Sequence, residues 1–207
     1  TGGPITGQIE AGAASDADGE GHIGRMFAYD GLSGDVVADN GMHYLYSRAD
    51  VSGDLTVTGD LDHLCVYRGD LSGEVTVDAS GTEEGNVSSL DVLGGRVTDN
   101  GMAIDPLIQV QGNVGRMRVA GDGENAAILT DDVEVGGDLD LLLVRGGSVN
   151  NDHIYVEGQT ANIIVIEGGL NSHVESQNGL QRLAVVGGDV SGGPIWTGGK
   201  LGRVFVS

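Results

Sequence analysis

The sequence predicts an all-β fold, a parallel β-helix (β-solenoid) of about nine coils, and three observations support this prediction. A short apolar motif recurs along almost the whole chain, glycine-rich turns separate its copies, and the apolar residues alternate as they do in strands. Self-similarity near 20 residues is typical of solenoids, in which each unit buries its apolar face by stacking on its neighbours. Because composition shows no break, we expect one solenoid over residues 1–207.

The first strand of each predicted coil carries the motif, with apolar residues at its first, fourth and sixth positions, as in Leu61-Asp-His-Leu64-Cys-Val66. Copies start at residues 23, 42, 61, 87, 114, 139, 161, 180 and 201, with spacings of 19 to 27 residues. Positions four and six alternate with position five, which indicates a strand with one buried face. Glycines interrupt every window that is long enough for a helix.

A glycine-containing corner and a second strand complete each predicted coil. Residues 69–73 illustrate the corner, and residues 54–57 and 74–77 illustrate the strand. Neighbouring coils lie about 4.8 Å apart, so nine coils would extend roughly 43 Å. The longer units are expected to carry surface loops at 78–86, 99–106 and 121–132. We expect a right-handed solenoid because crossovers between parallel strands are usually right-handed.

Charge and composition exclude several kinds of partner. The chain has 31 acidic and 10 basic residues, and its net charge is −21. A polyanion repels nucleic acid and anionic membranes, so we expect neither as a partner. Apolar runs reach only about four residues, as at 141–144, so no membrane insertion is expected. The single cysteine, Cys65, leaves no internal disulfide.

The two ends of the sequence read as complementary halves of one unit. Residues 201–207 carry a first half and residues 1–12 a second half, in which Ile5-Thr-Gly7 matches the turn Val51-Ser-Gly53. An isolated solenoid normally has polar caps, and neither end has one in its sequence. We expect an uncapped segment that continues end to end, as tandem copies or as separate subunits; truncation of the caps is the alternative. The expected end-to-end contacts are Leu201, Arg203, Val204 and Val206 with Ile5, Ile9, Ile23 and Met26.

Two glycine-rich phrases carry a resemblance to known families. Residues 69–77 (GDLSGEVTV) and 186–192 (VGGDVSG) resemble the glycine-rich tandem repeats of very large bacterial β-solenoid surface proteins. The chain resembles, more weakly, the bactofilins, which are cytoskeletal β-helices that polymerise end to end. The resemblance implies a structural polymer, and it transfers no catalytic residue.

The fifth position of each unit should face outward, where a soluble rod needs polar residues. This column is instead apolar towards both ends of the chain, and stacked copies would join the two apolar parts. Exposed apolar stripes usually mark an interface, so we expect lateral packing of the filament; coverage by a loop of the same chain is the alternative. The expected lateral contacts are Phe27, Tyr46, Cys65, Leu143, Val165, Ala184 and Phe205.

One acidic segment has the spacing of calcium ligands. Asp16, Asp18 and Glu20, followed by Gly21, match the first half of an EF-hand loop. Phe27 stands where the loop's last, bidentate glutamate would be, so neighbouring coils would have to complete the ligand shell. The segment suggests calcium as a cofactor, and a solvated acidic loop is the alternative.

The sequence favours a structural role over catalysis. Acidic residues are too numerous to single out a catalytic pair, the five histidines show no HxH or HxxxH spacing, and Ser72-Gly73 lacks the strand–turn–helix context of a nucleophile elbow. We expect no enzymatic activity and predict a structural subunit or repeat of an extracellular or cell-surface filament, with copies of itself as partners. The alternatives are an adhesin-like binding module that uses the loops and a polysaccharide-active β-helix enzyme.

Overall fold

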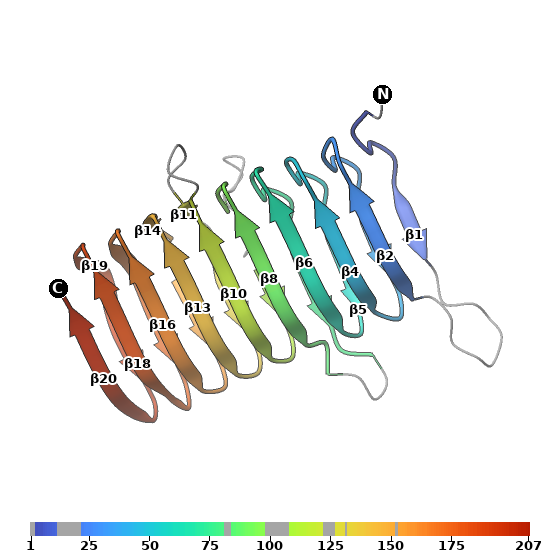
Figure 1. The fold of residues 1–207 in the computed structure, drawn as a ribbon. Coiled ribbons are helices and arrows are strands. Elements are labelled where there is room, and N and C mark those ends of the chain that lie inside the picture. Colours follow the sequence, from blue (N-terminus) through green and yellow to red (C-terminus); the bar gives the residue numbers. More distant parts are fainter. Residues whose placement is uncertain are drawn as a thin grey trace.

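The computed structural model describes residues 3–11, 22–80, 84–97, 108–121, 127–130, 132–151 and 153–207. These residues form strands and turns without a helix, and parallel strands stack into a β-solenoid of about 8 turns (Figure 1). The predicted fold class is therefore confirmed. The prediction was about nine coils. The first sheet has nine strands, and successive strands are separated by one turn, which gives about 8 turns. Strands β1 and β20 lie at opposite ends of the stack.

The first sheet is nine-stranded, and each strand pairs in parallel with the equivalent strand of the next turn. These are the strands that the apolar motif predicts. In order they are β2 (Ile23–Ala28), β4 (Met42–Ser47), β6 (Leu61–Tyr67), β8 (Val87–Leu93), β10 (Val114–Ala120), β13 (Leu139–Arg145), β16 (Thr160–Ile166), β18 (Gly179–Val186) and β20 (Lys200–Val206).

The second sheet has eleven strands and forms the opposite wall. Its main ladder contains β1 (Ile9–Ala11), β3 (Val36–Ala38), β5 (Leu55–Thr58), β7 (Val75–Asp78), β9 (Ile108–Val110), β12 (Val133–Val135), β15 (His153–Val156), β17 (Leu170–Ser176) and β19 (Val190–Thr197). A shorter ladder of β11 (Ala127–Leu129) and β14 (Gly147–Val149) joins it at β17. Single parallel bridges continue this shorter ladder back to Ile5.

The core is a set of apolar columns that run along the solenoid axis. The motif residues Leu61, Leu64 and Val66 are buried, and so are their counterparts in the turns on either side. One continuous cluster of buried apolar residues extends from Met26 to Val185. Because each side chain packs on the equivalent side chain of the next turn, small β-branched and leucine residues fill the narrow interior.

Glycine is required at the corners because backbone packs directly on backbone. A Cβ added to Gly53 would lie 2.2 Å from the carbonyl oxygen of Gly34, and one added to Gly34 would lie 2.1 Å from that of Gly7. Ile5 forms a parallel bridge with Leu32, and the Ser33 amide donates to the Ile5 carbonyl oxygen (2.8 Å). The match between Ile5-Thr-Gly7 and the later corners is therefore confirmed.

The register of one unit differs from the prediction. The core positions of β16 are Thr160, Ile163 and Val165, one residue earlier than expected, because Thr160 pairs with Leu180 and Val165 with Val185. The Thr160 hydroxyl is buried and donates to Ser176 Oγ (3.0 Å), so a polar residue is satisfied inside a core column. The expectation that Val165 faces outward is wrong: Val165 is fully buried, and Ile164 holds the outward position.

Most of the expected loop residues lie outside the described residues, which exclude 81–83, 98–107, 122–126 and 131. Within the described part, the segments between strands are short turns. The described residues contain no helical stretch with the length and apolar character of a membrane span.

Candidate functional site

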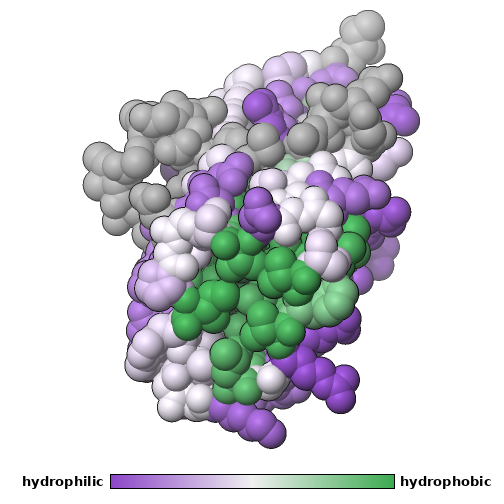
Figure 2. Space-filling view, turned by 90° about the vertical axis from the view of Figure 1, so that its left-hand side faces the viewer, coloured by the Kyte–Doolittle hydropathy of each residue, from purple (hydrophilic) through white to green (hydrophobic). Residues whose placement is uncertain are grey.

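The last turn of the solenoid exposes apolar side chains in columns that the earlier turns bury. Leu201, Val204 and Val206 of β20 are 44 to 51% exposed. Their partners one turn earlier, Leu180, Leu183 and Val185, are fully buried. Figure 2 looks onto this end of the molecule and shows the resulting apolar patch with polar residues around it. We call this patch, made of Leu201, Val204 and Val206, the terminal face.

The backbone at this end has an open edge in the part of the chain that the structure describes. Strand β20 pairs with β18 on one side, and no described strand pairs with its other side. Strand β19 pairs with β17 in the same way. An unpaired strand edge presents rows of N–H and C=O groups that can pair with another strand. The terminal face therefore combines an apolar centre with two hydrogen-bonding edges.

The opposite end carries the same columns. Ile5, Ile9 and Ile23 are half-buried there, whereas Met26 is nearly buried. A Cβ added to Gly7 would meet no described atom within 4 Å, in contrast to Gly34 one turn later. Nothing in the described chain therefore requires glycine at position 7. The glycines at the same corner of the next three turns, Gly34, Gly53 and Gly73, are required, and we call these four glycines the corner ladder.

The outward column of the first sheet is apolar at both ends and polar in the middle. Phe27 and Phe205 are exposed, and Tyr46, Cys65, Leu143 and Ile164 are half-buried. Ala184 lies in this column but is buried, because it pairs with Phe205 on one side and Ile164 on the other. In the middle of the sheet the column is polar, because Asp91 of β8 lies opposite Arg118 of β10 in the strand register. These two residues separate the two apolar parts of the column.

Aromatic and charged contacts stabilise the N-terminal half of this column. The ring of Phe27 lies 5.8 Å from that of Tyr44 and 6.3 Å from that of Tyr46. Arg116 forms an ion pair with Asp91 (2.5 Å). Burial raises the pKa of the Cys65 thiol, and the negative charge of Asp91 raises it further. Cys65 is therefore held as the neutral thiol, the less reactive form.

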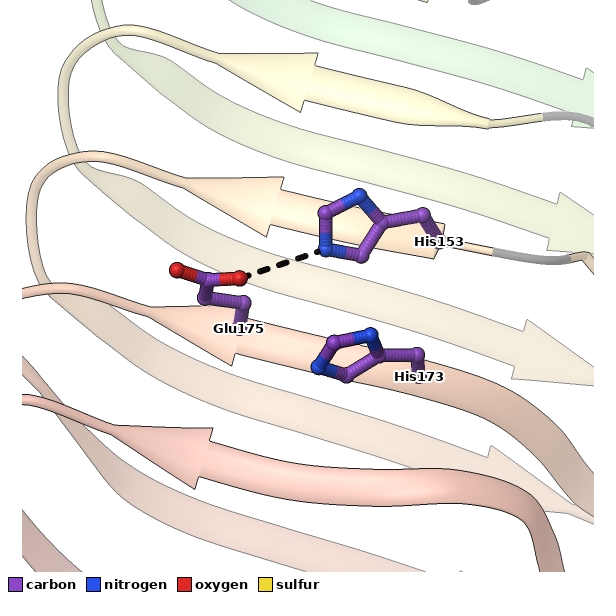
Figure 3. Close-up of side chains that lie close together, drawn as sticks. All are labelled: His153, His173 and Glu175. Carbon is purple, nitrogen blue, oxygen red and sulfur yellow. Dashed lines mark ion pairs between the residues drawn. The ribbon is translucent and has the colours of Figure 1, made fainter.

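A histidine and carboxylate cluster lies on the outer surface of the second sheet, and sequence inspection alone missed it. His153 of β15 pairs with His173 of β17, and Glu175 follows two residues later on the same side of β17 (Figure 3). One ligand atom from each of the three lies within 4.8 Å of the other two. The signal is not a local motif, because the pairing joins residues 20 positions apart.

The predicted calcium ligands Asp16, Asp18 and Glu20 lie outside the described residues. The structure therefore gives no geometry for that segment.

The chain matches no protein-family model, and comparisons with curated proteins and with solved structures find no match. The surfaces described above are therefore the basis for a functional proposal.

Proposed function

We propose that this chain is a structural unit of an extracellular filament in which copies of the same sequence stack end to end, as separate subunits or as tandem repeats. The observation that carries the proposal is the terminal face, where Leu201, Val204 and Val206 and the edges of two parallel sheets are exposed in the described part of the chain. A contact between two different ends of the same unit does not close on itself, so it generates an open fibre.

The columns fix the register of the proposed junction. The first turn of one copy would stack on the last turn of the preceding copy. The strands at the junction would pair in parallel, as the strands of successive turns do within the chain. In this register Ile5 lies over Val190, Ile9 over Ile195, Ile23 over Leu201, Met26 over Val204 and Ala28 over Val206. Both sheets then continue without a change of direction.

Two free-energy contributions favour the junction. Burying the exposed halves of Leu201, Val204 and Val206 would contribute about 1 kcal/mol for each side chain. Each new backbone hydrogen bond would add roughly 0.5–1.5 kcal/mol. Repulsion opposes these gains, because the net charge of each copy is −21 and Arg25 would join Arg182 and Arg203 in one column. Acidic side chains beside the arginine column can offset the repulsion within it, and salt screens the repulsion between copies.

Gly7 supports a backbone-on-backbone contact at the N-terminal end. Within the chain, Gly34 and Gly53 must be glycine because a Cβ added to either would lie 2.1 to 2.2 Å from a carbonyl oxygen of the preceding turn. Gly7 occupies the same corner, and in the proposed junction it would lie over Gly192 of the neighbouring copy. Glycine at position 7 then has the same steric reason as Gly34 and Gly53.

The same register brings the two apolar parts of the outward column together. Phe205 of one copy would lie beside Phe27 of the next, so Leu143, Ile164 and Tyr46 would extend one stripe across the junction. We propose that this stripe packs laterally against another filament strand. We propose a location outside the cell on the basis of the filament interpretation, and the acidic, lysine-poor composition and the resemblance to bacterial surface repeats support it. Calcium bound through Asp16, Asp18 and Glu20 is a further part of this proposal.

Sedimentation velocity and negative-stain electron microscopy of the 207-residue polypeptide test the proposal. We expect concentration-dependent assembly into fibres with an axial repeat of about 43 Å, from nine rungs at about 4.8 Å. The double variant Leu201→Asp/Val204→Asp should stay monomeric. The matched control Ser88→Asp/Asn150→Asp adds the same charge at exposed positions away from the ends, and it should still assemble.

A polypeptide that stays monodisperse at millimolar concentration would overturn the proposal. So would fibres that form equally well from the Leu201→Asp/Val204→Asp variant. The mass of the intact native polypeptide under denaturing conditions then distinguishes separate subunits from tandem copies, since tandem copies would give a multiple of the 21.1 kDa unit.

A further inference from the structure

We propose that His153, His173 and Glu175 form a binding site for one zinc-type divalent transition-metal ion that bridges two neighbouring turns of the solenoid. The three side chains come from β15 and β17, which are adjacent strands of the second sheet (Figure 3). A single ion bound by all three would connect one turn to the next on the outer surface.

The strand register brings the ligands together. His153 pairs directly with His173, so the two imidazoles occupy the same column, and their ring centroids lie 4.7 Å apart with planes inclined by 33°. Glu175 pairs with Tyr155 and follows His173 by two residues, so it projects from the same face as both histidines. The ligand atoms all lie within 4.8 Å of one another.

One pair of ligand atoms already has a spacing that suits zinc. Nε2 of His153 lies 3.6 Å from Oε2 of Glu175. Two ligands that are each 2.0–2.2 Å from a tetrahedral ion lie about 3.4 Å apart. A small side-chain rotation of His173, which is half-buried and faces outward, would bring the second imidazole into the shell.

Nε2 of His153 is not satisfied by any described residue. This atom is buried, and it has no hydrogen-bond partner among the described residues. Oε2 of Glu175 lies 3.6 Å from it, which is too long for a hydrogen bond. The lone pair of a neutral imidazole at this position would point into the space between the three side chains, where an ion would satisfy it.

The donor set selects the class of metal. Two imidazole nitrogens and one carboxylate oxygen are typical ligands of Zn²⁺ and of neighbouring transition metals, whereas Ca²⁺ and Mg²⁺ prefer shells of oxygen alone. Three protein ligands leave a fourth position for water or another group. The side chains of His153 and Glu175 are 34% and 25% exposed, so the cluster lies at the surface of the sheet.

The backbone beside the cluster is adapted to His173. The pairing of β17 with β19 is irregular at this residue, because Ser172 pairs with Gly192 and Val174 pairs with Ile195. Two residues of β19 therefore lie opposite His173 alone. A Cβ added to Gly193 would lie 2.9 Å from both Cα and Cβ of His173. A side chain at position 193 would therefore displace the backbone of His173, and glycine allows the two strands to approach each other at this point.

Titration calorimetry with zinc chloride on the untagged, chelator-treated 207-residue chain tests the proposal. We expect one high-affinity Zn²⁺ per chain that excess Ca²⁺ and Mg²⁺ do not displace. His153→Ala/His173→Ala should weaken binding at least 100-fold, and Glu175→Gln at least tenfold. The matched control His43→Ala/His63→Ala removes another pair of neighbouring surface histidines, 6.2 Å apart, and should bind as the unmodified chain does.

A second measurement needs no variant. Co²⁺ should replace Zn²⁺ and give the intense visible absorption of a four-coordinate site, and stoichiometric Zn²⁺ should abolish that absorption. Equal Zn²⁺ affinity in the His153→Ala/His173→Ala variant and the unmodified chain would overturn the proposal, as would a Co²⁺ spectrum typical of the hexahydrated ion. Circular dichroism of each variant verifies that the fold is retained. The site lies within one chain, so it can be measured on monomers whether or not filaments form.

Discussion

Val204 lies directly over Leu183 in the parallel register of β20 on β18, yet Val204 is 51% exposed and Leu183 is fully buried. The two residues occupy the same column of the same repeat, so their difference comes only from the presence of a following turn over Leu183. In a solenoid each turn is stabilised by its own packing and by the interface with its neighbours. The terminal turn has one such interface in the described chain, and interior turns have two.

The contrast predicts unequal effects of truncating the two side chains. Leu183→Ala should lower the free energy of unfolding by about 3 kcal/mol, because it leaves a cavity between two turns. Val204→Ala should cost less than about 1 kcal/mol in the dispersed chain, because half of the side chain is already in water. Urea denaturation at low protein concentration measures both values. Equal losses would contradict the inferred openness of the terminal face.

The corner ladder makes a second prediction. Gly53→Ala should destabilise the chain by roughly 1–3 kcal/mol, because the new Cβ would lie 2.2 Å from the Gly34 carbonyl oxygen and the backbone must move. Gly24→Ala is the matched control, since no atom of the described residues lies within 4 Å of its added Cβ and the residue does not need a positive φ. Thermal unfolding of the two variants should differ in the midpoint, with Gly24→Ala close to the unmodified chain.

The fold was predictable from sequence because one physical constraint repeats. Every turn must fill the same narrow interior, so the first, fourth and sixth positions of the motif are mostly apolar in turn after turn. Six strands of the first sheet begin at the first position of the motif, and β16, β18 and β20 begin one residue before its predicted start. The prediction was wrong at β16, where Thr160 occupies a core position. A buried threonine is acceptable there only because Ser176 accepts its hydrogen bond, and that partner comes from a different strand.

The candidate metal site was not predictable for a related reason. The histidines of a metal site on one strand or helix show a short spacing, but His153 and His173 meet through strand pairing between turns. Finding them needs the register of the second sheet, which the sequence marks less clearly because its strands are only three or four residues long in most turns. The terminal face, by contrast, follows from the motif alone, since Leu201, Val204 and Val206 are its first, fourth and sixth positions.

The corrected register of β16 can be tested directly. Val165→Asp should destabilise the chain by roughly 3 kcal/mol or more, because it places a carboxylate without a partner in the core. Ile164→Asp changes the adjacent outward residue and should cost about 1 kcal/mol, from the loss of a half-buried apolar side chain. Urea denaturation distinguishes the two. The reverse order of effects would restore the register that starts at Ala161.

The free energy of unfolding should decrease at alkaline pH because of two groups, the Cys65 thiol and the Tyr44 hydroxyl. Burial raises the pKa of both Cys65 and Tyr44, and the coulombic influence of Cys65 raises that of Tyr44 further. Each folded-state pKa is above its unfolded value, so the folded chain holds protons that the unfolded chain releases, and stability falls as the pH rises above roughly 9 to 10. The variant Cys65→Ala/Tyr44→Phe should lose less stability between neutral and alkaline pH. Parallel losses in thermal melts of both proteins would contradict this assignment.

Salt should promote filament assembly. Each copy carries a net charge of −21, so two copies repel each other as their ends approach, and the screening length shortens from about 10 Å at 0.1 M salt to about 3 Å at 1 M. The apolar contacts of the terminal face are not weakened by screening, so the critical concentration for assembly should fall as sodium chloride is added. Sedimentation velocity over a salt series measures it. The Leu201→Asp/Val204→Asp variant must stay monomeric across the series, because its assembly at high salt would indicate general precipitation, and a critical concentration that rises with salt would show that attraction between charges drives the contact.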